Sequence, residues 1–320
     1  MPPESEEEPK RPKQARAKES ARPAKSIELH DPHETIPIRL THPEKILDAS
    51  SGLTKAELAD YYRTIAPYML PHIGDRPLTL VRCMEGSGKP CFFQKHKTET
   101  LPDEIESIDI TDKKTGKPEP YITFSTDRAL VSLAQISVLE IHSWGSKNDS
   151  LETPDRIVID LDPDTAIDWR TLAQAADEVR RRFKALRLES FLKSTGGKGL
   201  HVVVPIQPEH DWPAIKAFAH KFVLEIEKDN PELYLTRMTK AMRKGKIYLD
   251  YLRNERGATS IAPYSPRARD GAHVAMPLDW PELKVRTPPI FSVSNLSRWK
   301  QRLANDPWDG IEEASQHLRL

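Results

Sequence analysis

Two aspartates one residue apart form the strongest chemical signal in the chain. Asp160 and Asp162 end the stretch Arg156-Ile-Val-Ile-Asp-Leu-Asp-Pro163, whose β-branched residues predict a short strand that the proline terminates. Because strand side chains alternate between faces, both carboxylates point the same way, roughly 7 Å apart along the chain. A hard divalent cation such as Mg²⁺ or Mn²⁺ would relieve their repulsion. The alternative is a strand that simply runs into an acidic turn.

A third aspartate extends this hypothesis. Asp250 lies in Lys246-Ile-Tyr-Leu-Asp-Tyr-Leu252, a second predicted strand, on the same face as Tyr248 and Leu252. Three carboxylates suit a pair of metal ions that bridge phosphate oxygens. One ion would activate a 3′-hydroxyl, and the other would neutralise a departing pyrophosphate. Phosphoryl or nucleotidyl transfer and a purely structural domain are equal alternatives for a chain with these residues.

Residues suited to binding phosphate accompany the carboxylates. In Gly196-Gly-Lys-Gly199, the glycines let backbone N–H groups approach an anion, and Lys198 adds a point charge. Arg267 and Arg269, two residues apart in a polar loop, could fork onto phosphate oxygens. The ordinary explanations are a hairpin turn and two surface arginines. The glycine loop lacks P-loop spacing and leads into a strand rather than a helix.

Two histidines interrupt apolar stretches near these motifs. His142 lies in Ile-His-Ser-Trp, and His201 follows the glycine loop on the next predicted strand. A core histidine with satisfied hydrogen bonds is the default interpretation of each. Combined with the carboxylates, the Gly-Lys loop and the arginines, they suit a site for a triphosphate and a metal ion.

The hydrophobic pattern predicts the elements that would position these residues. Thr54 and Glu57 have capping-box spacing and predict a helix start, followed by an apolar stripe of Leu58, Tyr61, Tyr62, Ile65 and Tyr68. Further helices are expected over 127–139, 169–186, 213–228 and 296–303, and further strands over 36–40, 77–83, 91–96, 121–124, 190–194 and 200–206. Hairpins interrupt any regular strand–helix alternation. The expected class is α/β or α+β with a mixed central sheet.

Adjacent aromatics on the strand 91–96 suggest a contact surface. Phe92 and Phe93 must face opposite ways, so one is expected in the core and the other partly exposed beside Lys95 and His96. An exposed aromatic beside basic residues is a stacking platform for nucleic-acid bases. An edge-strand phenylalanine covered by a loop is an equal alternative.

Composition bounds the broad class of the protein. The chain has 320 residues and a formal net charge of zero, so only local clusters can indicate nucleic-acid binding. Residues 1–28 are mostly Pro, Glu, Lys, Arg, Ser and Ala, which predicts a disordered charged tail or linker before a folded domain over 29–320. No apolar run of about 18 residues exists, so no membrane span is expected. No apolar signal segment opens the chain, which favours the cytoplasm.

The chain has two cysteines, Cys83 and Cys91, at either end of a predicted hairpin loop. They lack His or Cys partners at zinc spacing, which argues against a zinc site. We expect both to be thiols in a reducing cytosol.

The motifs together resemble the polymerase domain of bacterial DNA ligase D, an archaeo-eukaryotic primase-type polymerase of non-homologous end joining. The resemblance covers about Ile36 to Asp306 and rests on these segments, in this order: Pro77-Leu-Thr-Leu-Val-Arg-Cys, Cys91-Phe-Phe-Gln-Lys-His, Leu139-Glu-Ile-His-Ser-Trp, Asp160-Leu-Asp-Pro, Gly196-Gly-Lys-Gly-Leu-His, Leu249-Asp-Tyr-Leu-Arg-Asn and Ala262-Pro-Tyr-Ser-Pro-Arg-Ala-Arg. It implies a primase-polymerase core with an RRM-like module. It also implies template-dependent and end-tailing addition of NTPs or dNTPs, with ribonucleotides and Mn²⁺ favoured over dNTPs and Mg²⁺.

The resemblance also assigns expected roles to single residues. Asp160, Asp162 and Asp250 match the catalytic metal ligands. The expected nucleotide-binding residues are His142, Thr195, Lys198, His201, Arg253, Arg267 and Arg269. Lys45 and Lys55 match a pair that grips a DNA 5′-phosphate, and Phe92 and Phe93 match an aromatic pair near the template strand. One departure is that Ser194-Thr195 stands where the family usually has Thr-Ser before the glycines, which bears on sugar selectivity.

The resemblance finally implies partners. These are DNA with gaps or broken ends, Ku, and the ligase and nuclease domains of ligase D in cis or in trans, within the bacterial cytoplasm at the nucleoid. Two alternatives share much of this sequence pattern. One is a catalytically silent DNA-end-binding module, which the carboxylates disfavour because they repel phosphate. The other is a primase that starts chains without a primer.

Overall fold

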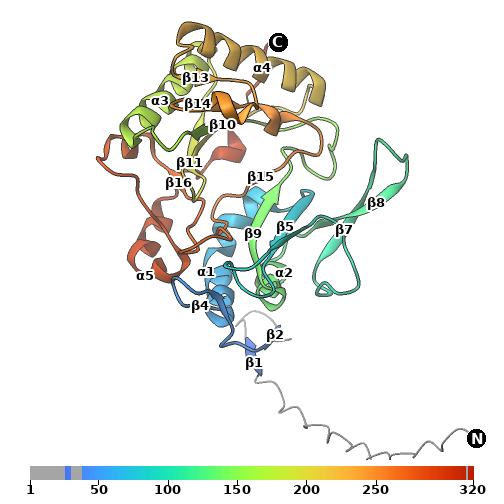
Figure 1. Ribbon diagram of the computed structural model, residues 1–320. Helices are drawn as coiled ribbons and strands as arrows, with labels where there is room; N and C mark the ends of the chain where they lie inside the picture. The colour runs from blue at the N-terminus through green and yellow to red at the C-terminus, as the bar shows by residue number, and fades with distance from the viewer. Residues whose placement is uncertain (1–25, 30–37, 315) are drawn as a thin grey trace, which may run out of the picture.

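The computed structural model describes residues 26–29, 38–314 and 316–320, and its main feature is a pair of sheets lying one above the other in Figure 1. The expected tail therefore lies outside the described residues except for residues 26–28. Those belong to β1 (Ser26–Leu29), which pairs with β2 (Ile38–Thr41). The fold is mixed α/β, as expected from the sequence.

The sheet that carries the aspartates has the chain order of an RRM-like module. It runs β10 (Arg156–Pro163), α3 (Trp169–Ala185), β11 (Phe191–Ser194), β12 (Leu200–Pro205), α4 (Trp212–Asp229) and β14 (Ile247–Asp250). The strands lie in the order β14-β10-β12-β11, and all three of these pairings are antiparallel. This is the βαββαβ arrangement with one central hairpin. Two short strands extend its edges: β13 (Tyr234–Leu235), which is parallel to β14, and β16 (Pro277–Leu278).

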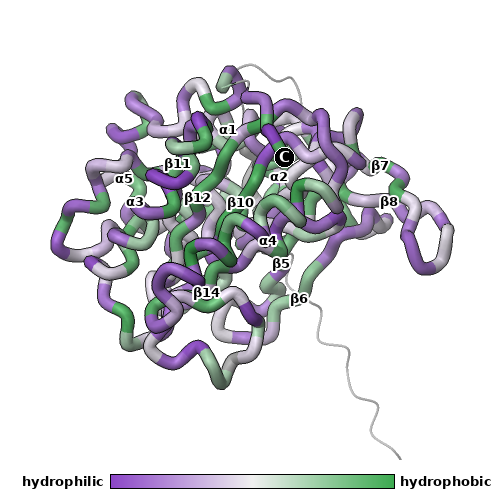
Figure 2. Tube along the Cα trace, turned by 90° about the horizontal axis from the view of Figure 1, so that it is seen from above, coloured by the Kyte–Doolittle hydropathy of each residue, from purple (hydrophilic) through white to green (hydrophobic). Residues whose placement is uncertain are grey.

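Alternation along β10 separates a packed face from a polar one. Ile157, Ile159 and Leu161 are fully buried in the main core, against which α3 and α4 pack. Asp160 and Asp162 point to the other face. Figure 2 shows the apolar strands β10 and β12 in the middle of the molecule, with hydrophilic loops around them. Burial of the apolar face thus fixes the direction in which the aspartates project.

The second sheet lies below the module in Figure 1, and α1 (Lys55–Ile73) and α2 (Asp127–Ser132) share a hydrophobic core with its strands. Its strand order is β15-β9-β5-β8-β7, with β6 also on β5. The bounds are β5 (Leu78–Arg82), β6 (Phe92–Gln94), β7 (Glu106–Thr111), β8 (Pro118–Thr123), β9 (Val138–Ser143) and β15 (Ser260–Ile261). Because β15 follows the module in sequence but pairs with β9, the chain crosses back between the two sheets.

Helix α1 starts as the sequence predicts. Thr54 is its N-cap and forms a reciprocal capping box with Glu57. The hairpin β3 (Ile46–Asp48) and β4 (Leu53–Thr54) leads into it. Of the predicted apolar stripe, Leu58, Tyr61, Tyr62 and Ile65 are buried, and Tyr68 packs partly buried against the core.

Two predicted helices are wrong in their second halves. The helix expected over 127–139 ends at Ser132; a 3₁₀ turn follows over Leu133–Ile136, and Ser137 has a left-handed φ of 58°. Residues from Val138 onward then form β9 instead, because they pair with β5. The helix expected over 296–303 is α-helical only over α5 (Leu296–Trp299) and continues as 3₁₀ turns. The periodicity of a buried run does not separate these forms.

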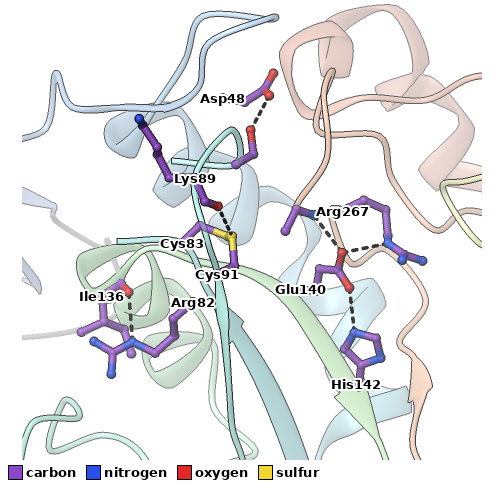
Figure 3. Close-up of a disulfide and its surroundings, with 11 residues drawn as sticks. Asp48, Arg82, Cys83, Lys89, Cys91, Ile136, Glu140, His142 and Arg267 are labelled. Atoms are coloured by element: carbon purple, nitrogen blue, oxygen red, sulfur yellow. Dashed lines mark hydrogen bonds and ion pairs between the residues drawn. A yellow bond between two sulfur atoms is a disulfide. The ribbon is translucent and has the colours of Figure 1, made fainter. Parts of the chain in front are cut away.

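The expectation of two thiols is also wrong, because Cys83 and Cys91 form a disulfide (Figure 3). The β5–β6 hairpin brings their Cα atoms to 4.4 Å. The sequence showed the hairpin but not this approach of the two side chains. In the described part of the chain, none of the helices combines the length and the apolar composition that a membrane span requires.

Candidate active site

Four polar residues form a row across the central sheet. Asp250 on β14 lies opposite Asp160 on β10, which lies opposite His201 on β12, which in turn lies opposite Lys193 on β11. Directly opposite residues of neighbouring strands point to the same face. Asp162, two residues beyond Asp160, shares that face. The three aspartates that the sequence singled out therefore meet on one surface.

Arginines supply the positive charge near these carboxylates. Arg253 donates from Nη2 to Oδ2 of Asp160 at 3.2 Å, and its Nε lies 3.5 Å from Oδ2 of Asp250. Arg243 donates from Nη1 to Oδ2 of Asp162 at 3.0 Å. The guanidinium groups thus act as counter-ions to all three carboxylates in this structure.

The carboxylates differ in their affinity for protons. Burial alone would raise the pKa of Asp160, but His201 and Arg253 outweigh it and hold that pKa below its ordinary value. Burial and the negative charge of Asp160 raise the pKa of Asp162. Burial likewise raises the pKa of Asp250, against the opposing effect of Arg253. The raised pKa values of Asp162 and Asp250 thus follow mainly from burial, and the lowered pKa of Asp160 follows from His201 and Arg253 beside it.

The three aspartates have the donor chemistry of a site for Mg²⁺ or Mn²⁺. Hard carboxylate oxygens from adjacent strands are the ligands that these ions prefer. Within the described part of the chain, no group of three or more His, Cys, Asp or Glu side chains is arranged to hold a metal ion. Arg253 lies between Asp160 and Asp250, and its side chain is 39% exposed, so it has room to turn outward. Asp160 and Asp250 could supply ligands to such an ion only with Arg253 displaced, because its guanidinium contacts both of them in this structure.

The glycine loop between β11 and β12 borders the row. Gly196 has a φ of 66°, and a Cβ there would lie 2.8 Å from Cγ of Arg267. A Cβ on Gly199 would lie 2.7 Å from the carbonyl oxygen of Leu161. Both positions therefore require glycine. Thr195 closes the loop by donating from its hydroxyl to the carbonyl of Gly199 at 3.1 Å.

A cavity of about 330 Å³ opens over the row and takes residues from both sheets. Asp160 and Asp162 line it, while Asp250 does not. The side chains to which the family resemblance assigns nucleotide binding all line it: His142, Thr195, Lys198, His201, Arg253, Arg267 and Arg269. A volume near 300 Å³ with convergent polar groups is typical of a small-molecule site. The walls combine two aspartates with four cationic side chains.

A buried glutamate that sequence reasoning did not single out organises one wall of this cavity. Oε2 of Glu140 accepts from Nε2 of His142 at 2.8 Å, and Oε1 accepts from Nε of Arg267 at 3.0 Å and from the Ala268 N–H at 2.9 Å (Figure 3). Arg267 also donates from Nη1 to the carbonyl of Thr195 at 2.9 Å. Burial opposes ionisation, yet these donors lower the Glu140 pKa to about 2. The sequence did contain a signal for this residue, because Glu140 is a charged residue within an otherwise apolar stretch.

The far end of the polar row holds a second residue that the sequence did not reveal. Lys193 is 1% exposed, and burial lowers its pKa well below the ordinary value. Among the described residues, neither its Nζ nor Nδ1 of His201 has a hydrogen-bond partner. Burial lowers the pKa of His201 to about 4, so its imidazole is neutral near neutral pH. His201 lines the cavity, and Lys193 lies next to it in the row.

Lys45 and Lys55 lie together, although ten residues separate them in sequence. The Lys55 N–H donates to the Lys45 carbonyl at 2.8 Å, and the positive charge of Lys45 is a secondary cause, after burial, of the lowered pKa of Lys55. Nζ of Lys55 donates to the carbonyls of Thr41 and Gln135, and Nζ of Lys45 donates to that of Met84. Both ammonium groups are thus held by backbone carbonyls, Lys55 is buried, and Glu44 is the nearby acidic group that acts on Lys55.

The prediction that one of the two phenylalanines enters the core is wrong. Phe92 is 45% exposed and Phe93 72% exposed; within the described residues, β6 has β5 as its one strand partner. The Arg82 guanidinium lies 5.2 Å from the centroid of the Phe92 ring. The Phe93 ring meets the His142 ring at 6.4 Å between centroids. Both aromatics are accessible, and Phe93 contacts His142, which lines the cavity above the polar row.

Comparisons with known proteins agree on one family. The model of the LigD primase-polymerase domain matches residues 54–308. The chain is 34% identical over 293 residues to the multifunctional non-homologous end joining protein LigD of Pseudomonas aeruginosa, covering 89% of this chain and 34% of that protein. It is 37% identical over 248 residues to the protein of the same name from Mycolicibacterium smegmatis, a match that covers 77% of this chain and 32% of that protein. The chain thus spans about a third of the length of these relatives.

A solved structure gives the same result for the fold. The polymerase domain of Mycobacterium tuberculosis ligase D in complex with DNA superposes with a TM-score of 0.79 and 28% sequence identity. The match covers 86% of this chain and 98% of that one.

Proposed function

Because this chain belongs to the LigD primase-polymerase domain family, we propose that it is a metal-dependent nucleotidyltransferase that extends DNA 3′ ends at double-strand breaks and short gaps. The observation that carries the proposal is the alignment of Asp160 with Asp250 beside a cavity lined by basic side chains. Carboxylates next to cations are what a triphosphate and its counter-ions require. Both ribo- and deoxynucleoside triphosphates are proposed substrates.

In this proposal Asp160, Asp162 and Asp250 hold two Mn²⁺ or Mg²⁺ ions. Bound there, the ions would activate the primer 3′-hydroxyl and neutralise the departing pyrophosphate. Arg253 would leave its position between Asp160 and Asp250, because the cations would repel its guanidinium and replace it as counter-ion. It would then turn toward the phosphates. The protein contributes rigid strands that hold the ligands in place.

The remaining cavity residues would bind the nucleotide. Lys198, Arg267 and Arg269 would donate to the triphosphate, and backbone N–H groups of the glycine loop would approach it closely. Thr195 keeps the hydroxyl of the usual serine, but its bond to Gly199 means that it must exchange partners to reach a nucleotide. Phe93, exposed beside His142, is placed to stack on a template base.

Lys45 and Lys55 would bind the 5′-phosphate on the downstream side of a gap. Their proximity, and carbonyl partners that do not carry a charge, support this role. The proposed partners are broken or gapped DNA, Ku, and the ligase and nuclease activities of the longer relatives, within one polypeptide or as separate chains. The proposed location is the bacterial cytoplasm, at the nucleoid.

A primer-extension assay with a labelled nucleotide, a gapped duplex and Mn²⁺ or Mg²⁺ tests this function. We expect extension with metal and none with EDTA. Asp162→Ala should lower the rate by about a thousandfold or more, because a metal ligand is lost. Asp177→Ala is the matched control, since that carboxylate is exposed on α3 and pairs with Arg181.

The outcomes separate the competing functions. Near-normal extension by Asp162→Ala would refute the metal mechanism. DNA binding without incorporation under any metal condition would favour a DNA-end-binding module. Product from a template that offers no 3′ end would favour a primase.

A further inference from the structure

One buried carboxylate joins three loops around the proposed active site. Asp48, at the end of β3, is fully buried. Its Oδ2 accepts from the Ser50 hydroxyl at 2.9 Å, from the Ser51 N–H at 2.9 Å and from the Gly271 N–H at 3.1 Å. Its Oδ1 accepts from the Ser87 hydroxyl at 2.7 Å (Figure 3). A serine in the first loop adds another link, because the Gly271 N–H also donates to Oγ of Ser50 at 2.6 Å.

Each of these loops carries a different part of the proposed site. The β3–β4 hairpin lies between Lys45 and Lys55. The loop that contains Ser87 joins β5 to β6 and leads to Phe92 and Phe93. The third loop, residues 266–273, carries Arg267 and Arg269. The loops that flank the 5′-phosphate lysines, lead to the aromatic pair and carry the triphosphate arginines are therefore all bonded to one side chain.

The physical chemistry of Asp48 makes this junction stiff. Burial raises the pKa of Asp48, but the serine hydroxyls and the backbone donor outweigh it and lower that pKa below its ordinary value. An ionised carboxylate forms stronger hydrogen bonds than a neutral acceptor, and leaving it unsatisfied when buried is costly. The loops cannot move apart without breaking such bonds. Asp48 does not line the nucleotide cavity, so its effect must be indirect.

We propose that Asp48 is a positioning residue that couples the two phosphate sites, so that a DNA 5′-phosphate bound at Lys45 and Lys55 tightens the binding of a nucleoside triphosphate at Arg267 and Arg269. This inference rests on the proposed function, because both sites belong to it. Coupling of this kind is reciprocal and changes affinity by about 5-fold or more.

The test compares the KM for nucleotide on two gapped duplexes that differ only in the downstream 5′-phosphate. In the unmodified protein, the 5′-phosphate should lower KM by about 5-fold or more. Asp48→Asn replaces one accepting oxygen with a donor, so this ratio should fall toward one. Asp112→Asn is the matched control, because Asp112 caps the β7–β8 turn in the same way, accepting from the N–H groups of Lys114 and Thr115.

Several results would overturn the inference. An unchanged KM ratio in Asp48→Asn contradicts it, as does an equal rise in KM on both duplexes, which marks a merely structural role. The unmodified protein could bind 5′-phosphorylated DNA more tightly and still have the same KM for nucleotide on both duplexes. In that case the coupling is absent while the proposed function stands. If the protein extends neither duplex, the proposed function itself fails.

A second variant keeps the test decisive if Asp48→Asn does not fold. Ser50→Ala removes the hydroxyl that donates to Asp48 and accepts from Gly271, while it leaves the buried carboxylate with its other donors. The ratio of its KM values on the two duplexes should be smaller than in the unmodified protein. A ratio as large as that of the unmodified protein contradicts the proposal. Melting temperature and circular dichroism confirm that each variant is folded.

Discussion

Asp160 and Asp250 face each other across antiparallel strands, and a single arginine contacts both. Arg253 lies 3.2 Å from Asp160 and 3.5 Å from Asp250. Two carboxylates on neighbouring strands would repel each other without that charge. The arginine and a divalent cation are therefore alternative solutions to the same electrostatic problem.

Competition between Arg253 and the metal leads to a first prediction. Arg253→Gln should lower the melting temperature in EDTA, because Asp160 and Asp250 lose their shared counter-ion. The increase in melting temperature on adding Mn²⁺ should be larger than in the unmodified protein, because the ion no longer displaces a guanidinium. Thermal unfolding with and without Mn²⁺ measures both. Equal metal-induced shifts in the two proteins would show that Arg253 and the ion do not share a position.

Glu140 should affect nucleotide binding more than chemistry. Glu140→Gln keeps the size of the side chain but removes the negative charge that holds His142 and Arg267. We expect KM for nucleotide to rise about tenfold with a smaller change in kcat. Steady-state extension kinetics measure this. Glu119→Gln, a change of a glutamate on β8 that pairs with His96, is the control. A loss confined to kcat would place Glu140 in the chemical step instead.

Glu140 should also affect the acid stability of the protein. Its folded pKa of about 2 lies below the ordinary value of 4.5, so its contribution is fully present above about pH 4.5 and is lost as the pH falls toward 2. The contribution is on the order of 3 kcal/mol. Urea unfolding at a series of pH values should therefore show that the free energy of unfolding of Glu140→Gln falls less between pH 4.5 and pH 2 than that of the unmodified protein. Parallel curves for the two proteins would mean that folding does not perturb this carboxyl group.

The lysine pair should recognise the phosphate rather than DNA in general. Replacing Lys45 with Gln and Lys55 with Met should weaken binding to gapped DNA that carries a 5′-phosphate and leave binding to unphosphorylated DNA unchanged. The slope of the logarithm of the binding constant against the logarithm of the salt concentration should become shallower by up to about two. Fluorescence anisotropy at several salt concentrations measures both quantities.

A control pair tests the specificity of that result. Lys221 and Lys228, both exposed on α4, can be changed to Gln together. Because they lie away from the β3–β4 hairpin in sequence and structure, this variant should keep its preference for the 5′-phosphate. If the Lys45/Lys55 variant loses affinity equally for both DNAs, the two lysines are general backbone contacts.

The Cys83–Cys91 bond should stabilise the hairpin that presents Phe92 and Phe93. Reduction, or Cys83→Ser with Cys91→Ser, should lower the free energy of unfolding by about 2 kcal/mol, as expected for a short closed loop. Denaturant unfolding with and without a dithiol reductant measures this. Titration of the unfolded, unreduced protein with a thiol reagent should detect no free thiol, and two thiols per chain would rule the disulfide out.

Much of the fold could be predicted because its signals are local. The Thr54–Glu57 capping box and the amphipathic helix from Trp169 depend on residues a few positions apart. Alternation along β10 likewise placed Asp160 and Asp162 on one face. Helix 127–139 was partly wrong because β9 is a strand only through its pairing with β5, a contact that is distant in sequence.

The sequence by itself determined the residue types of the site and, through the order of its motifs, the family to which the chain belongs. The tertiary structure alone decided which side chains meet: Asp250 beside Asp160, Glu140 between His142 and Arg267, and Lys193 at the end of the polar row. It also decided that Cys83 bonds to Cys91. The reason is that strand register and loop approach are fixed by burial of the whole core, which no single stretch of sequence contains.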